Sequence, residues 1–362
     1  RNVGNWDVCL SNRQWRSVGR RAEPLWIGDR RIDAPVLLAP MSGVTDAPFR
    51  RLALKLGAPA VVSEMIASHE AVRQSRVTLA RLKAEADERP RSIQLAGHDP
   101  RAIAEATRFC IDLGADVIDL NFGCPAKKVT DKYCGSALMR APAEAGALMA
   151  AAVGAALPHG VPVTAKMRTG WAADQRNAPD FARIAEAEGI AAVTVHGRTR
   201  DQKYAGRADW AFIRAVKQAI AIPLTANGDV VDAASLDRCL ALSGADAAMI
   251  GRGAYGRPWI VGQAARYLTT GRWPAEPSPT EKAELFAEHY EAMLAHYGRE
   301  RGLRHARKHV GWYLTGLEGA AALRARLMRE EDPTIVLARV RRALTTRPSD
   351  IRQPATAEAA RC

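Results

Sequence analysis

The chain has 362 residues, of which 48% are hydrophobic and 25% charged, a globular composition that excludes a disordered or collagen-like chain. Lysine and arginine number 52 against 39 acidic residues, so the formal net charge is +13 and the sequence pI is about 9.8. This excess favours a polyanionic partner, either a nucleic acid or an anionic surface.

The sequence shows no pattern typical of a membrane segment, a secretory leader or a metal centre. The longest apolar runs, 36–41 and 145–157, are too short or too rich in alanine and glycine to span a bilayer. Six scattered cysteines form no Cys-x-x-Cys pair, so no metal site is expected. Reduced thiols in a cytoplasmic protein are the default interpretation.

In chain order, residues 1–24 lack helical or strand periodicity, and we expect an irregular extension. From residue 35 onward, short apolar runs alternate with alanine-rich amphipathic stretches. The predicted strands are 36–41, 60–64, 91–95, 116–122, 161–167, 191–196, 222–226 and 246–251. The predicted helices are 46–56, 100–113, 143–156, 180–188, 210–219 and 233–242. Eight such units predict an α/β fold, a (β/α)8 TIM barrel over residues 25–270.

The pattern changes at residues 271–280, where three prolines in ten residues indicate a linker. Amphipathic helices without strands follow, and they predict a small all-helical C-terminal domain over 281–346. The last residues, 347–362, are expected to be a disordered tail. From Arg299 to Arg329, eight Lys or Arg residues stand against two acids, so positive charge is concentrated in this domain.

Glycine-rich turns follow the last two predicted strands. One strand ends in Asn227-Gly228-Asp229 and the next in Gly251-Arg252-Gly253. Barrels often bind phosphate at these two loops, where glycines let backbone N–H groups approach an anion and an arginine adds a cation. Each turn alone is also compatible with a purely structural role. Together they favour a phosphate-bearing cofactor.

Polar residues end the other strands and should converge on the same barrel mouth. The residues Pro40, Met41 and Ser42 offer backbone and an apolar edge to a flat ring, and Gln94 can hydrogen-bond an amide-like ring edge. Lys166 can stabilise negative charge or, alternatively, form a Schiff base. Arg168 follows on the same strand. His196 is either a mouth residue or a satisfied core histidine.

Cys124 follows the predicted strand 116–122 and stands where a reactive side chain would. The nearby Lys127 and Lys128 could tune its acidity, and such a thiol can act as a general acid. The alternative is a buried, inert cysteine.

Seven segments of the chain form an ordered set of motifs. They are PMSGVTDAPFR (40–50), DLNFGCPAKKV (119–129), CGSALMR (134–140), AKMRTGW (165–171), VHGRTRDQKYAGRADW (195–210), ANGDV (226–230) and IGRGAYGRPW (250–259). In this order and spacing they resemble the tRNA-dihydrouridine synthases. The helical segment RHARKHVGWYL (304–314) is similar to the bacterial B subgroup.

The resemblance implies an enzyme that binds FMN and is reduced by NADPH or NADH. It places His196 near the flavin and the target base, and Cys124 at the catalytic thiol. The flavin-contacting positions that it implies are Pro40, Met41, Ser42, Gln94, Lys166, Asn227, Gly228, Asp229, Gly251 and Arg252.

The implied reaction reduces the C5–C6 double bond of a D-loop uridine in tRNA, at position seventeen. Reduced FMN delivers hydride to C6, and Cys124 supplies the proton to C5. Lys166, Arg168 and His196 then hold the base or stabilise the developing charge.

A uridine must leave its stack to reach a barrel mouth, so the enzyme must grip the tRNA elsewhere. Arg304, Arg307 and Lys308 share one helix face and are the predicted tRNA-binding residues. A monomer is expected. Two alternatives remain: an FMN-dependent oxidoreductase of a free pyrimidine, similar to dihydroorotate dehydrogenase, or a non-enzymatic RNA-binding regulator.

Overall fold

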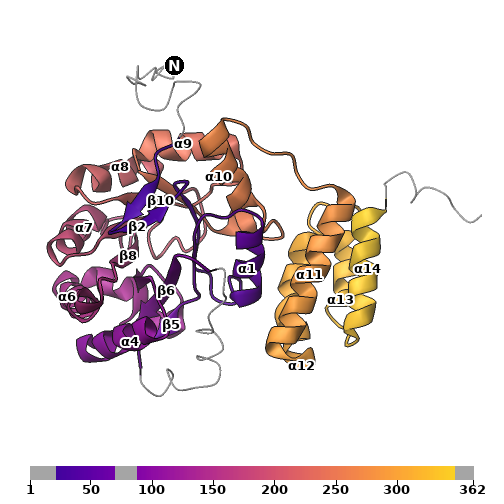
Figure 1. The fold of residues 1–362 in the computed structure, drawn as a ribbon, viewed down its shortest axis with the longest axis horizontal. Helices are drawn as coiled ribbons and strands as arrows, with labels where there is room; N and C mark the ends of the chain where they lie inside the picture. Colours follow the sequence, from indigo (N-terminus) through magenta and orange to yellow (C-terminus); the bar gives the residue numbers. More distant parts are fainter. Residues whose placement is uncertain (1–21, 70–87, 347–362) are drawn as a thin grey trace, which may run out of the picture.

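A closed parallel barrel forms the larger part of the molecule (Figure 1). The computed structural model describes residues 22–69 and 88–346, so most of the predicted extension and all of the predicted tail lie outside the described residues. Over the described residues, eight strands form the barrel: β3 (Val36–Leu38), β4 (Val61–Val62), β6 (Arg91–Ala96), β7 (Val117–Phe122), β8 (Val163–Arg168), β9 (Ala192–His196), β10 (Leu224–Asn227) and β11 (Ala247–Ile250). Parallel pairing of β4 with β6 and of β11 with β3 closes the ring. The predicted (β/α)8 barrel is confirmed.

Helices pack around the outside of the barrel. They are α1 (Ala47–Lys55), α4 (Pro100–Asp112), α6 (Pro142–Ala156), α7 (Ala178–Ala187), α8 (Trp210–Ala219), α9 (Ala233–Ser243) and α10 (Ile260–Thr270). Aspartates cap α1, α4, α8 and α9, where each side chain accepts a hydrogen bond from a first-turn N–H group. Their apolar faces and the strands share one buried core. Because helices cover the outer face of the sheet, both faces of each strand are buried and the strands read as continuous apolar runs.

Two short elements of the barrel have no counterpart in the sequence prediction. An antiparallel hairpin of β1 (Leu25–Ile27) and β2 (Arg30–Ile32) packs its apolar side chains on residues inside the barrel. Arg30 donates to the carbonyls of Asp116 and Gly160, beside the starts of β7 and β8. The hairpin therefore closes the amino end of the barrel. Strand β5 (Ile66–Ala67) adds a short pairing to the carboxyl end of β6.

Helix α10, which contains Gly262, is also absent from the helices predicted from the sequence. A Cβ at Gly262 would lie 2.0 Å from the carbonyl oxygen of Leu56, so the absent side chain lets α10 approach the end of α1 closely. The glycine weakens a helical pattern in the sequence, yet tertiary packing requires it.

A helical bundle follows the barrel and lies beside α1 (Figure 1). It consists of α11 (Pro279–Tyr297), α12 (Arg299–Tyr313), α13 (Ala320–Leu327) and α14 (Pro333–Thr345), which bury their own apolar core. Among the described residues, no helix is both long enough and apolar enough to cross a membrane.

An extended segment, 271–278, joins α10 to the bundle. Helix α11 begins at Pro279, two residues before the predicted start of the helical domain at 281, because Ser278 and Glu281 form a reciprocal capping box around Pro279. Within the segment, Glu276 accepts hydrogen bonds from Arg257 at 2.6 Å and from Trp259 at 3.1 Å.

Substituting Gly262→Ala should destabilise the protein by about 1–3 kcal/mol, because the new methyl group collides with backbone rather than with a movable side chain. The matched control is Gly154→Ala in α6, where a Cβ would meet nothing within 4 Å. The free energy of unfolding of the control should rise by about 0.5–1 kcal/mol, because alanine has a higher helix propensity than glycine. Urea unfolding measures both changes; equal effects would contradict the close approach of α10 to α1.

Candidate active site

The carboxyl ends of the barrel strands surround a cavity of about 580 Å³, a size typical of small-molecule sites. Every barrel residue that the sequence predicted as catalytic or cofactor-binding lines this cavity: Pro40, Met41, Ser42, Gln94, Cys124, Lys166, Arg168, His196, Asn227, Gly228, Asp229, Gly251 and Arg252. Barrel closure thus brings together side chains that are far apart in the sequence.

A chain of hydrogen bonds fixes the polar groups on one side of the cavity. Buried Asp119 accepts from Gln94 Nε2 at 2.7 Å and from Thr164 Oγ1 at 2.6 Å. The other end of the Gln94 amide accepts from Asn121 Nδ2 at 2.7 Å. The Asn121 Oδ1 in turn accepts the backbone N–H of Cys124 at 2.9 Å. Both ends of Gln94 are therefore fixed, and Asn121 orients the turn that presents the thiol.

Asp119 and Asn121 are not among the site residues predicted from the sequence. The available signal was that these two polar residues interrupt an apolar strand, β7. Burial raises the pKa of Asp119, while the hydrogen bonds from Thr164 and Gln94 lower it.

Lys166, on β8, extends its side chain toward the end of β10. Its Nζ donates to Asn227 Oδ1 at 3.1 Å, and Asn227 Nδ2 donates to the Met249 carbonyl at 2.8 Å. Burial, aided by the positive charge of Arg168, lowers the pKa of Lys166 to about 8. The ammonium form therefore predominates at neutral pH but is lost within the alkaline range.

His196 is held as a neutral ring at the end of β9. Burial first, and then the nearby cations led by Lys166, lower its pKa well below the usual range. Arg198 Nη1 lies 3.3 Å from His196 Nε2 and can only donate, so Nε2 accepts and the proton resides on Nδ1. A Cβ on Gly228 would lie 2.9 Å from His196 Cδ2, so this position needs glycine.

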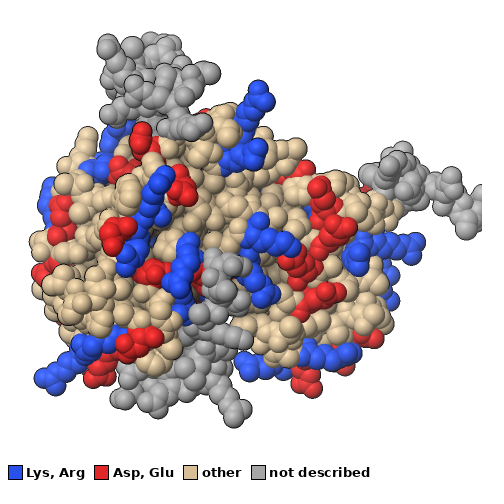
Figure 2. All heavy atoms as spheres, viewed as in Figure 1, with Lys and Arg blue, Asp and Glu red and all other residues tan. Residues whose placement is uncertain are grey.

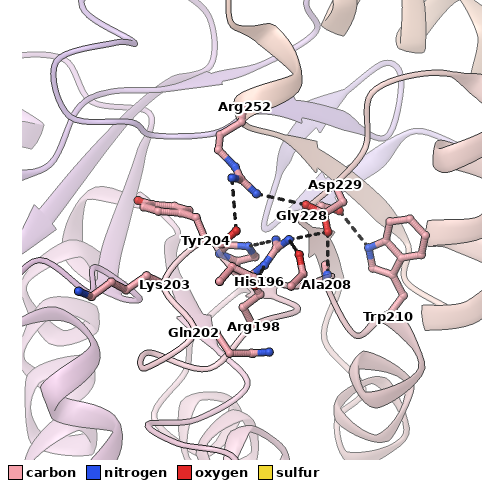
Figure 3. Close-up of polar contacts among 12 residues, drawn as sticks. His196, Arg198, Gln202, Lys203, Tyr204, Ala208, Trp210, Gly228, Asp229 and Arg252 are labelled. Carbon is pink, nitrogen blue, oxygen red and sulfur yellow. Dashed lines mark hydrogen bonds and ion pairs between the residues drawn. The ribbon is translucent and has the colours of Figure 1, made fainter.

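Arg198 is a buried connector between loops, as Figure 3 shows. Besides His196, it donates to the carbonyls of Ala205 at 3.0 Å and Gly206 at 2.7 Å. It also pairs with Asp229 Oδ2 at 2.7 Å. The same carboxylate oxygen accepts the Ala208 N–H at 2.7 Å. The Asp229 side chain is thus engaged in holding the loops after β9 and β10 together.

Arg252 stands more openly at the cavity rim (Figure 3). Its Nη2 lies 3.3 Å from Asp229 Oδ1, and its guanidinium lies 5.1 Å from the centre of the Tyr204 ring. It is therefore the exposed cation beside the glycine turns that follow β10 and β11.

The guanidinium of Arg168 is held by hydrogen bonds to backbone carbonyls. Its Nε donates to the Gly123 carbonyl at 2.7 Å, next to Cys124. Its Nη1 donates to the carbonyls of Thr199 at 2.9 Å and Lys203 at 2.8 Å. Arg168 therefore ties the thiol-bearing turn to the loop after β9.

Cys124 is partly exposed and lines the cavity. The exposed Lys127 and Lys128 line the same cavity from the short helix α5 (Lys127–Thr130). The thiol thus faces the cavity from the side of β7, with cationic side chains near its rim.

The three predicted tRNA-binding residues of the bundle differ in exposure. Arg304 is exposed, whereas Arg307 and Lys308 are half-buried. A Cβ on Gly43 would lie 2.7 Å from Lys308 Nζ, so this ammonium points at the barrel loop after β3. On the face drawn in Figure 2, Lys and Arg side chains of the bundle are interspersed with Asp and Glu.

The fold and the cavity define a barrel enzyme whose active site lies at the carboxyl ends of the strands. The comparison with protein families is more specific, because residues 37–347 match the family described as dihydrouridine synthase. The chain belongs to the dihydrouridine synthase family, and the predicted resemblance is confirmed.

Curated relatives support this assignment over nearly their whole length. A probable tRNA-dihydrouridine synthase of Rhodobacter capsulatus is 50% identical, covering 88% of this chain and 97% of the relative. A tRNA-dihydrouridine synthase B of Pseudomonas aeruginosa is 45% identical over 90% of this chain and 97% of its own.

Solved structures share the fold at low identity. A 2-naphthoyl-CoA reductase complex gives a TM-score of 0.54 at 13% identity, covering 67% of this chain and 51% of that chain. A histamine dehydrogenase from Rhizobium also gives 0.54, at 12% identity and 74% and 50% coverage.

Replacing the buried connector, Arg198→Met, should destabilise the protein by about 3 kcal/mol, because it removes a buried charge partner and leaves loop carbonyls unpaired. Arg183→Met is the matched control, since Arg183 pairs with Asp180 on the surface. The control should change the free energy of unfolding by less than about 1 kcal/mol. Chemical denaturation compares the two, and similar small losses would show that Arg198 does not hold the loops.

Proposed function

We propose that the protein is a tRNA-dihydrouridine synthase that reduces the C5–C6 double bond of a D-loop uridine, at position seventeen, with FMN and NADPH or NADH. The single observation that carries this is the convergence of the thiol of Cys124, the cation of Lys166 and neutral His196 on one cavity flanked by glycine turns. The family assignment supports the same reaction.

The cavity suits FMN in shape and in chemistry. A Cβ on Gly251 would fill space 3.7 Å from Ala39 Cβ and from Met41 Sδ, so glycine leaves a shallow cradle between these loops. The exposed guanidinium of Arg252 and the glycine turns offer a phosphate site. The fixed amide of Gln94 and the Lys166 ammonium offer polar groups to a flavin ring.

Bound and reduced FMN would supply hydride to C6 of uracil. The protein's own residues would do the rest. Cys124 gives its thiol proton to C5, which balances the added hydride as a net gain of two hydrogens. The Lys166 ammonium stabilises negative charge that develops toward the C4 carbonyl. His196 acts as a neutral hydrogen-bonding group, because its environment excludes the imidazolium.

Arg168, which the sequence predicted as catalytic, contributes as a positioning residue in this proposal. Its donors already serve three backbone carbonyls, including that of Gly123 beside the thiol. It acts on the reaction by fixing the turn that carries Cys124.

The bundle supplies the grip on tRNA, with exposed Arg304 and half-buried Arg307 as the proposed phosphate contacts. Recognition through phosphates and shape leaves the uridine free to turn out of its stack into the cavity. A tRNA substrate also fits the predicted cytoplasmic location and monomeric state, which stay predictions.

The test incubates the FMN-loaded protein with unmodified tRNA and NADPH and measures dihydrouridine by nucleoside mass spectrometry. Cys124→Ala should retain flavin and its reduction by NADPH but lose at least about 99% of dihydrouridine formation, the effect of removing a general acid. Cys134→Ala, the matched control on the same loop, should keep most activity.

Three results would count against parts of this proposal. Full turnover in Cys124→Ala would exclude Cys124 as the acid. Oxidation of NADPH without any dihydrouridine would point to a free pyrimidine as substrate. Binding of tRNA by a chain that takes up no flavin would point to a regulator.

The affinity for FMN should depend on pH through Lys166. Its pKa is lowered to about 8, so the cation that favours an anionic ligand is present below that pH and disappears above it. In a Cys124→Ala background, FMN binding should weaken by roughly tenfold between about pH 7 and about pH 9. Flavin fluorescence quenching measures it. Lys166→Met should bind weakly with a flat profile; an unchanged slope in that variant would assign the effect to another group.

A further inference from the structure

One side of helix α12 is partly packed against the barrel and partly exposed to solvent. Arg304, Lys308 and Trp312 follow one another at four-residue spacing, so they share one side of the helix. Arg304 is exposed, but the next two side chains contact barrel loops. The segment 304–314 therefore combines an exposed cation, Arg304, with side chains that pack against the barrel.

The charge of Lys308 is close enough to two buried carboxylates of the barrel to interact with them, without forming a direct ion pair. The Lys308 Nζ sits beside Gly43, and Asp46 and Glu64, each only 2% exposed, raise its pKa against the larger effect of burial. The two acids also repel each other: burial raises the pKa of Asp46 to about 6, and the charge of Glu64 adds to that rise. Asp46 further accepts a hydrogen bond from Tyr297 of α11 at 3.0 Å.

Arg50, another cation near this site, also lowers the pKa of Asp46, but its hydrogen bonds and its ion pair go to other groups. Its Nε lies 2.7 Å from Glu88 Oε1 in a buried ion pair, and its Nη1 donates to the Thr45 carbonyl at 2.9 Å. Lys308 is thus the cation that the bundle contributes to the pair of acids, Asp46 and Glu64.

Glu64 connects Lys308 to the cavity. Its Oε1 accepts the backbone N–H of Gly43. Gly43 belongs to a tight turn in which Val44 and Thr45 donate to the Met41 carbonyl at 2.8 and 3.0 Å. Met41 lines the cavity. A shift of Glu64 would therefore move the turn that shapes the proposed flavin site.

The same helix supports the loop on the neighbouring strand. Trp312 stacks on Tyr255 with ring centres 3.9 Å apart and planes at 14°. Tyr255 lines the cavity and follows Arg252 by three residues. Since β3 and β11 are paired, α12 contacts the loops after two adjacent strands of the barrel.

We propose that Lys308 is a positioning residue of the cofactor site: from the bundle, its positive charge offsets part of the charge of Asp46 and Glu64 and so helps to hold the 41–45 turn in its FMN-binding form. This rests on the proposed function for the identity of the ligand. The proposed positioning role replaces the prediction from the sequence that Lys308 binds tRNA phosphate. The helical pattern indicates which residues share a face of α12, but it does not show that barrel loops pack against that face.

The first test measures FMN affinity without RNA. The apo protein is titrated with FMN and flavin fluorescence is followed. Lys308→Met, which keeps a long unbranched side chain but removes the charge, should weaken FMN binding by roughly tenfold, or about 1.4 kcal/mol. Arg301→Met, the control at an exposed position of the same helix, should leave FMN affinity unchanged. Unchanged affinity in a folded Lys308→Met protein would overturn the proposal.

The second test separates positioning from RNA contact. With FMN saturating, loss of a phosphate contact lowers the slope of log K against log salt by about 0.7–0.9. Arg304→Met should show this loss for tRNA, whereas Lys308→Met should keep the wild-type slope. A reduced slope in Lys308→Met would identify it as a tRNA ligand. Failure of the wild-type protein to bind FMN at all would instead refute the proposed function.

The third test asks whether Lys308 acts through Glu64. In a double-mutant cycle, Glu64→Gln and Lys308→Met should together weaken FMN binding by less than the product of their separate effects. Lys308→Arg, which keeps a cation facing the acids, should restore affinity to within about threefold of wild type. Independent effects in the cycle, or no rescue by arginine, would contradict a charge-based link.

Discussion

Closure of the barrel is the constraint on which the rest of the molecule depends. Because β4 pairs with β6 and β11 with β3, the sheet has no free edge between its first and last strands, and all strands end in one ring. A polar residue at the end of any strand must then face the same space. This is why residues as distant as Met41 and Arg252 line one cavity.

The sequence predicted the strands and the mouth residues because both follow from short-range patterns. An apolar run bounded by glycine turns identifies a strand, and the residue at its end falls at the mouth. The pattern did not predict α10, because Gly262 lowers the helix propensity of this segment. Glycine is required there by the close packing against Leu56, which is distant in the sequence. The pattern also did not predict how Asp119, Gln94 and Asn121 are connected, because partners on neighbouring strands are set by register.

Several charged side chains around the cavity, which the sequence alone would suggest as reactive groups, hold loops in place instead. Arg168 and Arg198 donate mostly to carbonyls, and the Asp229 carboxylate is shared between two loops and Arg252. These contacts cost desolvation but leave the turns with defined geometry. In the proposed reaction, partly exposed Cys124 and buried Lys166 then act from a preorganised frame.

The anchoring of the connecting segment has a consequence for how a uridine is selected. Glu276 binds Arg257 and Trp259 at the start of the last barrel helix and lies 3.4 Å from Lys282 in α11. Gln263 in α10 also donates to the carbonyls of Pro274 and Ala275. These contacts restrict how far the bundle can move relative to the cavity. If the bundle holds tRNA as proposed, the distance between those contacts and the cavity helps to decide which nucleotide reaches the thiol.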